Sequence, residues 1–178
     1  MINFKKQIEN IAEIQLKYAK GNPRALDLGC GEGKGSLLLA EKGFFVDAID
    51  KNIERILKFK EALENTNLQN RINIVNEDFR KLKFKRNYYD FIICVNLLHL
   101  LSKKDAIWAI KKIYSSLKPN STALILFKKK EFPLINNFCK FDILYTEFFI
   151  QNNEPYLYLD LKKPPPIVKL KRMIIKYF

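Results

Sequence analysis

The chain has 178 residues, of which 48% are hydrophobic and 29% are charged, a globular composition that excludes an intrinsically disordered protein. Lysine and arginine (32) outnumber aspartate and glutamate (19), which gives a formal net charge of +13 at pH 7. No apolar run reaches the roughly 18 residues of a membrane-spanning helix, and the charged N-terminus lacks the apolar block of a signal peptide. The three cysteines are widely spaced without a CxxC pair, which disfavours a disulfide framework and a zinc knuckle. We therefore expect one cytoplasmic domain, residues 1–178, without a metal site.

Short aliphatic runs alternate with longer amphipathic segments over the first two thirds of the chain, a pattern typical of a parallel sheet covered by helices. Strand 89–95 is apolar almost throughout, so we expect it to be central and buried on both faces. Residues 53, 56, 57 and 63 share one apolar face of their helix. The predicted order is helix 2–19, strand 24–28, helix 36–41, strand 44–49, helix 53–63, strand 72–75, strand 89–95, helix 102–117 and strand 123–127.

The alternation of strands and helices stops after residue 127. Two strand-like runs, 143–150 and 156–161, are separated only by Gln-Asn-Asn-Glu-Pro. A parallel crossover needs a dozen residues or more, so this short link predicts an antiparallel hairpin. The prolines at 164–166 then break the chain, and the periodicity of residues 167–178 does not decide between a strand and a helix. We expect 1–20 to form an N-terminal helix and 162–178 a basic C-terminal tail of the same domain.

The most informative motif is the glycine-rich turn Gly29-x-Gly31-x-Gly33, which follows the first predicted strand. Such a turn lies at the carboxyl edge of a doubly wound sheet, where ligands bind. The turn is not a dinucleotide-binding GxGxxG, because Lys34 stands where a third glycine or alanine is required. Asp27, two residues before the first glycine, suits a cationic amino-acid moiety better than a pyrophosphate by the sign of its charge.

Two further acids close the next two predicted strands. Asp50 follows the second strand, where a carboxylate can accept hydrogen bonds from both ribose hydroxyls, a feature shared with dinucleotide folds. Asp78 follows the third strand and can accept from an adenine amine, with Phe79 beside the ring. Three acids at the ends of three successive strands therefore indicate a nucleoside site at this edge of the sheet.

Four segments, LDLGCGEGKGS, VDAID, EDF and YDFIICVNLLHLL, together resemble the successive motifs of class I S-adenosylmethionine-dependent methyltransferases, over roughly Arg24 to Phe127. Within that superfamily, LDLGCG, LAEKGFFVDAIDKN and YDFI are most similar to the small tellurite-resistance and thiol methyltransferases. The resemblance implies a Rossmann-like α/β fold, with a doubly wound, mostly parallel sheet and a C-terminal antiparallel hairpin. LKPNS departs from the family's frequent LKPGG, and Asn120 can take the left-handed conformation of the replaced glycine.

The resemblance also implies that the cofactor is S-adenosyl-L-methionine and assigns parts of it to residues. The glycine turn and Asp27 would hold the methionine part, and Asp50 the ribose. Adenine would lie against Asp78 and Phe79, and the methyl group at the end of the fourth strand. The residues implied to bind the cofactor are Asp27, Gly29, Cys30, Gly31, Gly33, Asp50, Lys51, Asp78, Phe79, Asn96 and Leu97.

Methyl transfer from a sulfonium disperses positive charge, so it depends on alignment and water exclusion more than on acid–base chemistry. A general base is needed only where the nucleophile carries a proton of high pKa, such as that of a hydroxyl. His99, the single histidine, is the candidate base, and the alternative is that it packs as a neutral rim residue. The apolar run from Asn96 to His99 lacks the Asn/Asp-Pro-Pro-aromatic pattern of enzymes that methylate exocyclic amines. This favours a small-molecule methyl acceptor.

Two other functions stay open at this point. Residues 80–86 hold five cations in seven positions with an interleaved aromatic, and residues 162–178 hold six cations and no acid. Nucleic-acid binders often show such segments, so an RNA methyltransferase is the first alternative. Lysine is abundant throughout this chain, however, which favours an ordinary solvated face for both segments. The second alternative is a non-catalytic binding module, because a fold does not fix its function.

Overall fold

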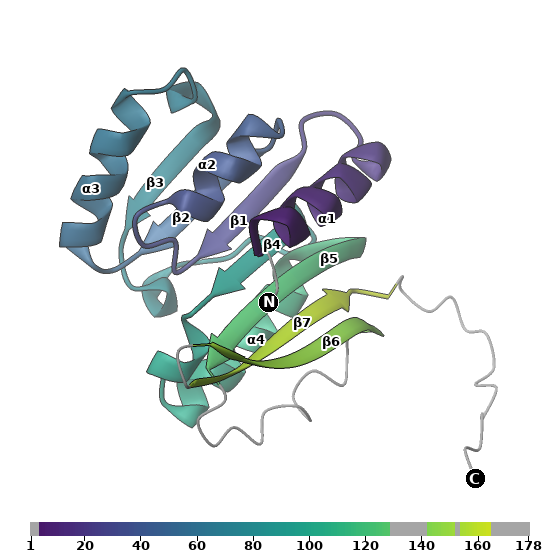
Figure 1. The fold of residues 1–178 in the computed structure, drawn as a ribbon. Coiled ribbons are helices and arrows are strands. Elements are labelled where there is room, and N and C mark those ends of the chain that lie inside the picture. Colours follow the sequence, from purple (N-terminus) through teal and green to yellow (C-terminus); the bar gives the residue numbers. More distant parts are fainter. Residues whose placement is uncertain (1–3, 129–141, 152–153, 165–178) are drawn as a thin grey trace, which may run out of the picture.

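A seven-stranded sheet with helices on both faces forms the described part of the chain, residues 4–128, 142–151 and 154–164 of the computed structural model (Figure 1). The strand order is β3-β2-β1-β4-β5-β7-β6. The strands are β1 (Arg24–Leu28), β2 (Phe45–Asp50), β3 (Ile72–Asn76), β4 (Tyr89–Val95), β5 (Leu117–Lys128), β6 (Asp142–Gln151) and β7 (Glu154–Lys162). The helices are α1 (Phe4–Tyr18), α2 (Lys34–Glu41), α3 (Ile53–Glu64) and α4 (Lys103–Ser116), with short 3₁₀ turns η1 (Gln69–Arg71), η2 (Phe79–Lys81) and η3 (Leu98–Leu100).

The sheet is doubly wound, which confirms the predicted fold class. β1 pairs in parallel with both β2 and β4, and β3 and β5 extend the parallel sheet outward on either side. The chain therefore reverses its direction of winding between β1 and β4, and such a switch point is where open α/β sheets bind ligands. The turns that follow β1 and β4 meet at this point of the sheet.

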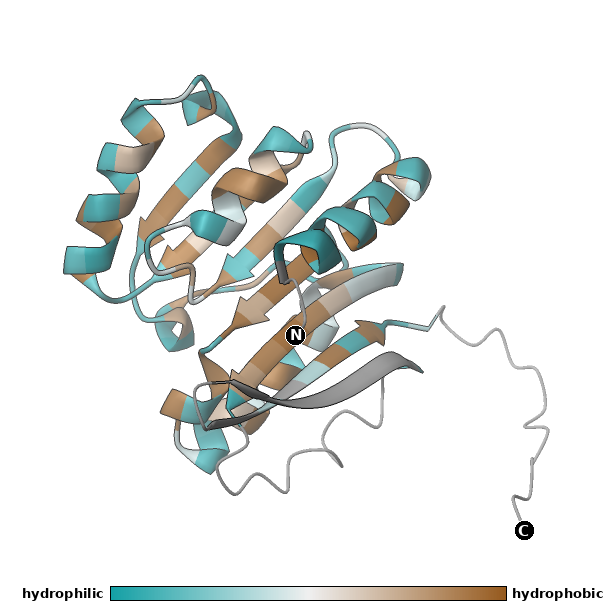
Figure 2. Cartoon of the chain, viewed as in Figure 1, coloured by the Kyte–Doolittle hydropathy of each residue, from teal (hydrophilic) through white to brown (hydrophobic). Residues whose placement is uncertain are grey.

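Two clusters of buried residues form the core, one on each face of the sheet, and the central strands are largely hydrophobic (Figure 2). Every residue of β4 except the last is buried, in agreement with the prediction that this strand is central. Helices α1, α2 and α3 pack with one cluster of buried residues, and α4 packs with the other on the opposite face. Burying an aliphatic or aromatic side chain contributes about 1.5–3 kcal/mol each, so the two clusters stabilise the sheet from both faces.

The C-terminal strands form the predicted antiparallel pair. β6 pairs with β7 and β7 pairs with β5, both in antiparallel register. Directly after β7, the ammonium of Lys163 is buried and donates to Asn87 Oδ1 at 2.7 Å and to the carbonyl of Leu117 at 2.8 Å. Of the predicted basic tail, 162–178, Lys162 ends β7 and residues 165–178 fall outside the described residues. Within those residues, every helix is too short or too polar to cross a membrane, and the cytoplasmic location stays a prediction.

Two local predictions were wrong. α4 ends at Ser116, and Leu117 begins β5 instead of ending the helix. Pairing of Leu117 with Tyr89 of β4 extends the strand back to this point, ahead of Asn120, which takes the expected left-handed conformation at φ 66°. In addition, helix α2 begins at Lys34, before the predicted residue 36.

The apolar face proposed for the third helix is only half right. Ile56 and Leu63 are buried, whereas Ile53 and Leu57 are 51% and 57% exposed. The buried face is completed by Phe59, which is fully buried three residues after Ile56. This ring reaches the glycine turn, so the helix packs against the candidate site.

Candidate functional site

The glycine turn after β1 is pinned to the end of β2 and to helix α3. The backbone N–H groups of Gly29 and Cys30 both donate to the carbonyl of Ile49, at 2.8 and 3.0 Å. Gly33 has a φ of 81°, and a Cβ at this position would collide with the ring of Phe59. Both the positive φ and the close approach of the Phe59 ring therefore require glycine at position 33.

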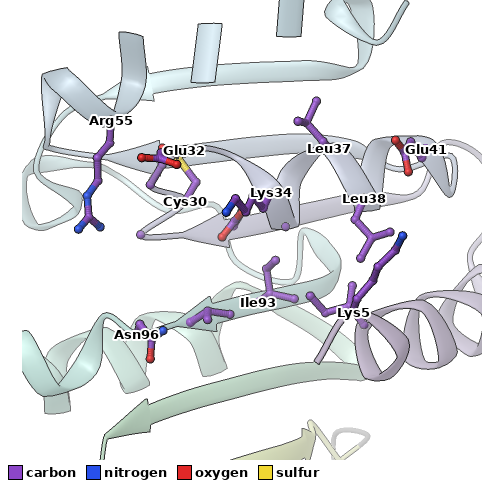
Figure 3. Close-up of a pocket in the computed structure, with 16 residues that line it drawn as sticks. Lys5, Cys30, Glu32, Lys34, Leu37, Leu38, Glu41, Arg55, Ile93 and Asn96 are labelled. Atoms are coloured by element: carbon purple, nitrogen blue, oxygen red, sulfur yellow. Dashed lines mark hydrogen bonds between the residues drawn. The ribbon is translucent and has the colours of Figure 1, made fainter. Parts of the chain in front are cut away.

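A cavity of about 820 Å³ opens beside this turn, at the switch point of the sheet (Figure 3). Its volume lies within the usual range for small-molecule sites. Its walls come from the ends of β1 and β4, from α2 and from the start of α1. It is lined by Lys5, Ile8, Asp27, Gly29, Cys30, Gly31, Glu32, Lys34, Gly35, Leu37, Leu38, Glu41, Arg55, Ile93, Val95 and Asn96.

The cavity includes part of the set of predicted cofactor residues. Five of them contribute to its lining, namely Asp27, Gly29, Cys30, Gly31 and Asn96. Burial raises the pKa of the Cys30 thiol well above its ordinary value, so this side chain is a neutral wall and not a nucleophile. The remaining candidates lie outside the lining: Gly33, Asp50, Lys51, Asp78, Phe79, Leu97 and His99.

Asp50 shapes the cavity although it does not line it. One carboxylate oxygen accepts from the backbone N–H of Gly31 at 2.9 Å, and the other accepts from that of Asn52 at 2.8 Å. The acid therefore fixes the glycine turn and the start of α3 at once. Each oxygen keeps a further lone pair, so the pair of oxygens can still accept from two neighbouring hydroxyls.

Asp27 is a buried carboxylate beneath the turn, only 3% exposed. Its Oδ2 accepts from the hydroxyl of Ser36 at 2.7 Å. Burial raises its pKa to about 7, an effect that Ser36 opposes and the charge of Asp50 reinforces. Among the described residues, no lysine or arginine forms an ion pair with it. A ligand cation in the cavity would offset the cost of this buried charge.

Asp78 and Phe79 do not line the cavity. Asn76 pairs with Asp50 across β3 and β2, and Asp78 lies two residues further along the chain. The guanidinium of Arg80 donates to the Asp78 carboxylate. The hydrogen bonds from Arg80 lower the pKa of Asp78 to about 2, and the charge of Lys51 adds to this. Phe79 is buried and packs in the core against the α4 side. The contact of this pair with adenine stays a prediction.

The turn after β4 closes the other side of the switch point. Asn96 is exposed with a φ of 55°, and the side chain of Leu97 lies against the face of Gly29, 3.1 Å from where a Cβ would stand. His99 is half-buried, and its Nδ1 accepts from the backbone N–H of Lys128 at 3.4 Å. In the neutral imidazole the proton then lies on Nε2, so Nδ1 is not free to take a proton from a substrate.

Sequence reasoning missed three cations at the cavity, Lys5, Lys34 and Arg55. Lys34 was noted only for not being glycine, and Arg55 follows the cap of α3, close to Gly31. Lys5 reaches the cavity because α1 packs beside α2 on one face of the sheet, with its first turn near the carboxyl ends of β1 and β4 (Figure 1). No local signal could have revealed this long-range contact.

Three cations of the basic segment 80–86 already have partners within the described residues. Arg80 pairs with Asp78 and Asp105, Lys81 pairs with Glu77 at 3.1 Å, and Lys85 lies 4.8 Å from the centre of the Tyr88 ring. Among all the residues that the structure describes, no three His, Cys, Asp or Glu side chains form a group that could bind a metal ion.

Replacing Asp27 with asparagine is expected to remove a pH-dependent loss of stability. The raised pKa means that the folded state holds this proton between about pH 4 and pH 7, so ionisation destabilises the fold as the pH rises through that window. We expect the variant to gain unfolding free energy relative to the wild type at pH 8 and little at pH 4, measured by urea denaturation. An equal difference at both pH values would contradict this account of Asp27.

Comparison with known proteins points to methyltransferases at each level. Residues 25–120 match the model of a family described as a methyltransferase domain. A glycine/sarcosine N-methyltransferase of Aphanothece halophytica is 28% identical over 141 residues, which make up 76% of this chain and 51% of that protein. TehB of Haemophilus influenzae, described as a probable S-adenosyl-L-methionine-dependent methyltransferase, is 32% identical over 90 residues, 51% of this chain and 30% of TehB. The chain spans about half or less of the length of the curated relatives that it matches.

Solved structures share the fold at low identity. TehB from Haemophilus influenzae superposes with a TM-score of 0.71 over 89% of this chain and 62% of TehB, at 20% identity. Magnesium protoporphyrin IX methyltransferase from Synechocystis PCC 6803, with bound S-adenosylmethionine, gives 0.70 over 92% and 85% of the two chains, at 19% identity. The [4+2]-cyclase SpnF gives 0.74 over 91% and 82%, at 17% identity. These likenesses concern the fold alone. The same fold carries different reactions, since one of these proteins is named a cyclase and another a methyltransferase.

Proposed function

This chain belongs to the family of methyltransferase domains, and on that premise we propose that it transfers the methyl group of S-adenosyl-L-methionine to a small-molecule acceptor. The observation that carries the proposal is the buried Asp27, which has no cationic partner among the described residues and lines the cavity beside the glycine turn. An amino-acid ammonium group is the complement of such a carboxylate, and the cofactor supplies both this group and the reactive methyl sulfonium.

Binding and alignment are the main tasks of the residues in this mechanism. Asp27 would face the cationic methionine part, and Asp50 the ribose hydroxyls through the lone pairs that Gly31 and Asn52 leave free. Because Asp50 also fixes the turn, the same carboxylate would set both the ribose and the loop that cradles the methionine part. Leu97, packed against Gly29, would limit water access where the methyl group is transferred.

A small acceptor is supported by the surroundings of the cavity. The turn from Leu97 to Leu101 is apolar apart from His99, and its Leu100 is 69% exposed. The relative named above for glycine and sarcosine also points to a small acceptor. RNA is less well supported, since Arg80, Lys81 and Lys85 have partners within the fold.

The test combines cofactor binding with a panel of acceptors. Isothermal titration with S-adenosylhomocysteine should give saturable binding, and methyl-labelled cofactor should label at least one of glycine, sarcosine, a small thiol or tellurite. Labelling of RNA alone, with an affinity that falls steeply with salt, would replace the proposed acceptor class by the nucleic-acid alternative. Cofactor binding without labelling of any acceptor would favour the non-catalytic module, and binding of NADH instead would overturn the proposal.

The role of His99 gives a further prediction. His99→Ala is expected to lower turnover by less than ~10-fold, because Nδ1 is occupied by the Lys128 N–H and a soft or unprotonated nucleophile needs no base. Steady-state kinetics with the identified acceptor would measure this, with the affinity for S-adenosylhomocysteine as the control. A loss beyond ~10³-fold with unchanged cofactor affinity would show that His99 is a general base.

A further inference from the structure

Arg80 joins two acids that belong to distant parts of the chain. Its Nε lies 2.9 and 3.1 Å from the two oxygens of Asp78, after β3, and its Nη1 lies 2.8 Å from Oδ2 of Asp105, in the first turn of α4. Asp78 and Asp105 keep only 15% and 26% of their side-chain surface exposed. Nη2 also donates to Oδ2 of Asp78, so Nε and Nη2 hold the two oxygens as a fork, which fixes the plane of the carboxylate as a single ammonium cannot.

The fork gives Asp78 one defined orientation. Besides the guanidinium, the backbone N–H of Arg80 donates to Oδ1 of Asp78 at 3.0 Å. We infer that Arg80 is a positioning residue, which holds the Asp78 carboxylate for the adenine amine of the cofactor and ties that contact to the start of α4. The inference rests on the proposed cofactor function. It gives Arg80, a cation of the basic segment 80–86, a role at the cofactor site in place of contact with RNA.

The second acid connects this contact to the turn beside the cavity. Ser102 caps α4 by accepting from the backbone N–H of Asp105 at 3.1 Å. The segment from Asn96 to Ser102 joins the cavity wall to this cap. Through Arg80, the acid proposed for adenine is therefore connected to the segment that borders the methyl group.

The fold does not depend on these ion pairs to hold α4. Phe79 is 8% exposed, and its ring lies 5.6 Å from that of Trp108, so apolar packing already joins η2 to α4. Partly exposed ion pairs contribute little to stability. The network is thus suited to orienting a group, and its removal should affect recognition more than folding.

The experiment compares two ligands that differ at the adenine amine, S-adenosylhomocysteine and S-inosylhomocysteine. Arg80→Ala is expected to raise the Kd for S-adenosylhomocysteine by ~10-fold and that for S-inosylhomocysteine by less than about twofold. Arg80→Lys should not restore the affinity, because it keeps the charge without the fork. Asp105→Asn should give a smaller loss, about threefold, confined to the adenine ligand. Lys81→Ala is the matched control, since it removes a neighbouring cation that is paired with Glu77.

The outcomes separate this inference from the proposed function. An adenine-specific loss in Arg80→Ala, with a melting temperature close to that of the wild type, supports the positioning role. Equal losses for both ligands, no loss for either, or the same loss in Lys81→Ala would overturn it. A wild-type protein that binds neither ligand would overturn the proposed cofactor function itself.

Discussion

Asp50→Ala is expected to weaken the binding of S-adenosylhomocysteine by roughly a hundredfold. The variant would lose the acceptors for two ribose hydroxyls, and hydrogen bonds to a charged group contribute about 1.5 kcal/mol or more each. It would also release the N–H groups of Gly31 and Asn52, which are 2.9 and 2.8 Å from this carboxylate, so the turn would lose its fixed position. Isothermal titration at a temperature where the variant is folded would measure the effect.

A matched control lies on the same strand. Asp47 is also in β2, but its oxygens accept from Tyr89 and Asn73, away from the cavity. Asp47→Asn should therefore leave the Kd within about twofold of the wild type, even if it lowers stability. If Asp50→Ala bound the ligand as tightly as Asp47→Asn, the ribose assignment and the role of Asp50 in the turn would both be wrong.

The part of the site that sequence could predict consists of residues whose roles are local. Gly33 and Asp50 could be singled out because a glycine turn and an acid at a strand end both leave a pattern within a few residues. The structure gives Gly33 a positive φ and bonds Asp50 to the turn, and the contacts of both with the cofactor stay predictions. The fold class followed for the same reason, since each strand and helix has its own period.

The part that sequence could not predict depends on contacts between distant segments. Lys5 lines the cavity only because α1 packs beside α2 on the sheet face, and Leu117 joins β5 only because Tyr89 of β4 lies beside it. Leu117 follows Ile113 at helical spacing, so the local pattern favoured a helix until tertiary pairing overrode it. The ion pairs of Arg80 with Asp78 and Asp105 could not be predicted for the same reason, because a run of lysines and arginines indicates only a solvated face.

Gly33→Ala is expected to destabilise the protein by about 2–5 kcal/mol, a large part of the 5–15 kcal/mol of a typical domain. A left-handed φ costs an alanine about 1–2 kcal/mol, and the new Cβ would also collide with Phe59. That ring is fully buried, so it cannot move aside without displacing the core of α3. Urea denaturation would measure the loss in unfolding free energy.

Gly21→Ala separates the two causes of this loss. Gly21 has a similar φ, 75° against 81°, but a Cβ there meets no atom within 4 Å. It should therefore show only the backbone cost, and the difference between the two variants is the cost of the collision. In the double variant Gly33→Ala/Phe59→Leu, a smaller side chain replaces the ring, so the collision with the new Cβ is relieved. This double variant should recover part of the stability lost through the collision. If the two glycine variants lost equal stability, the packing of α3 against the turn would not be what requires glycine at position 33.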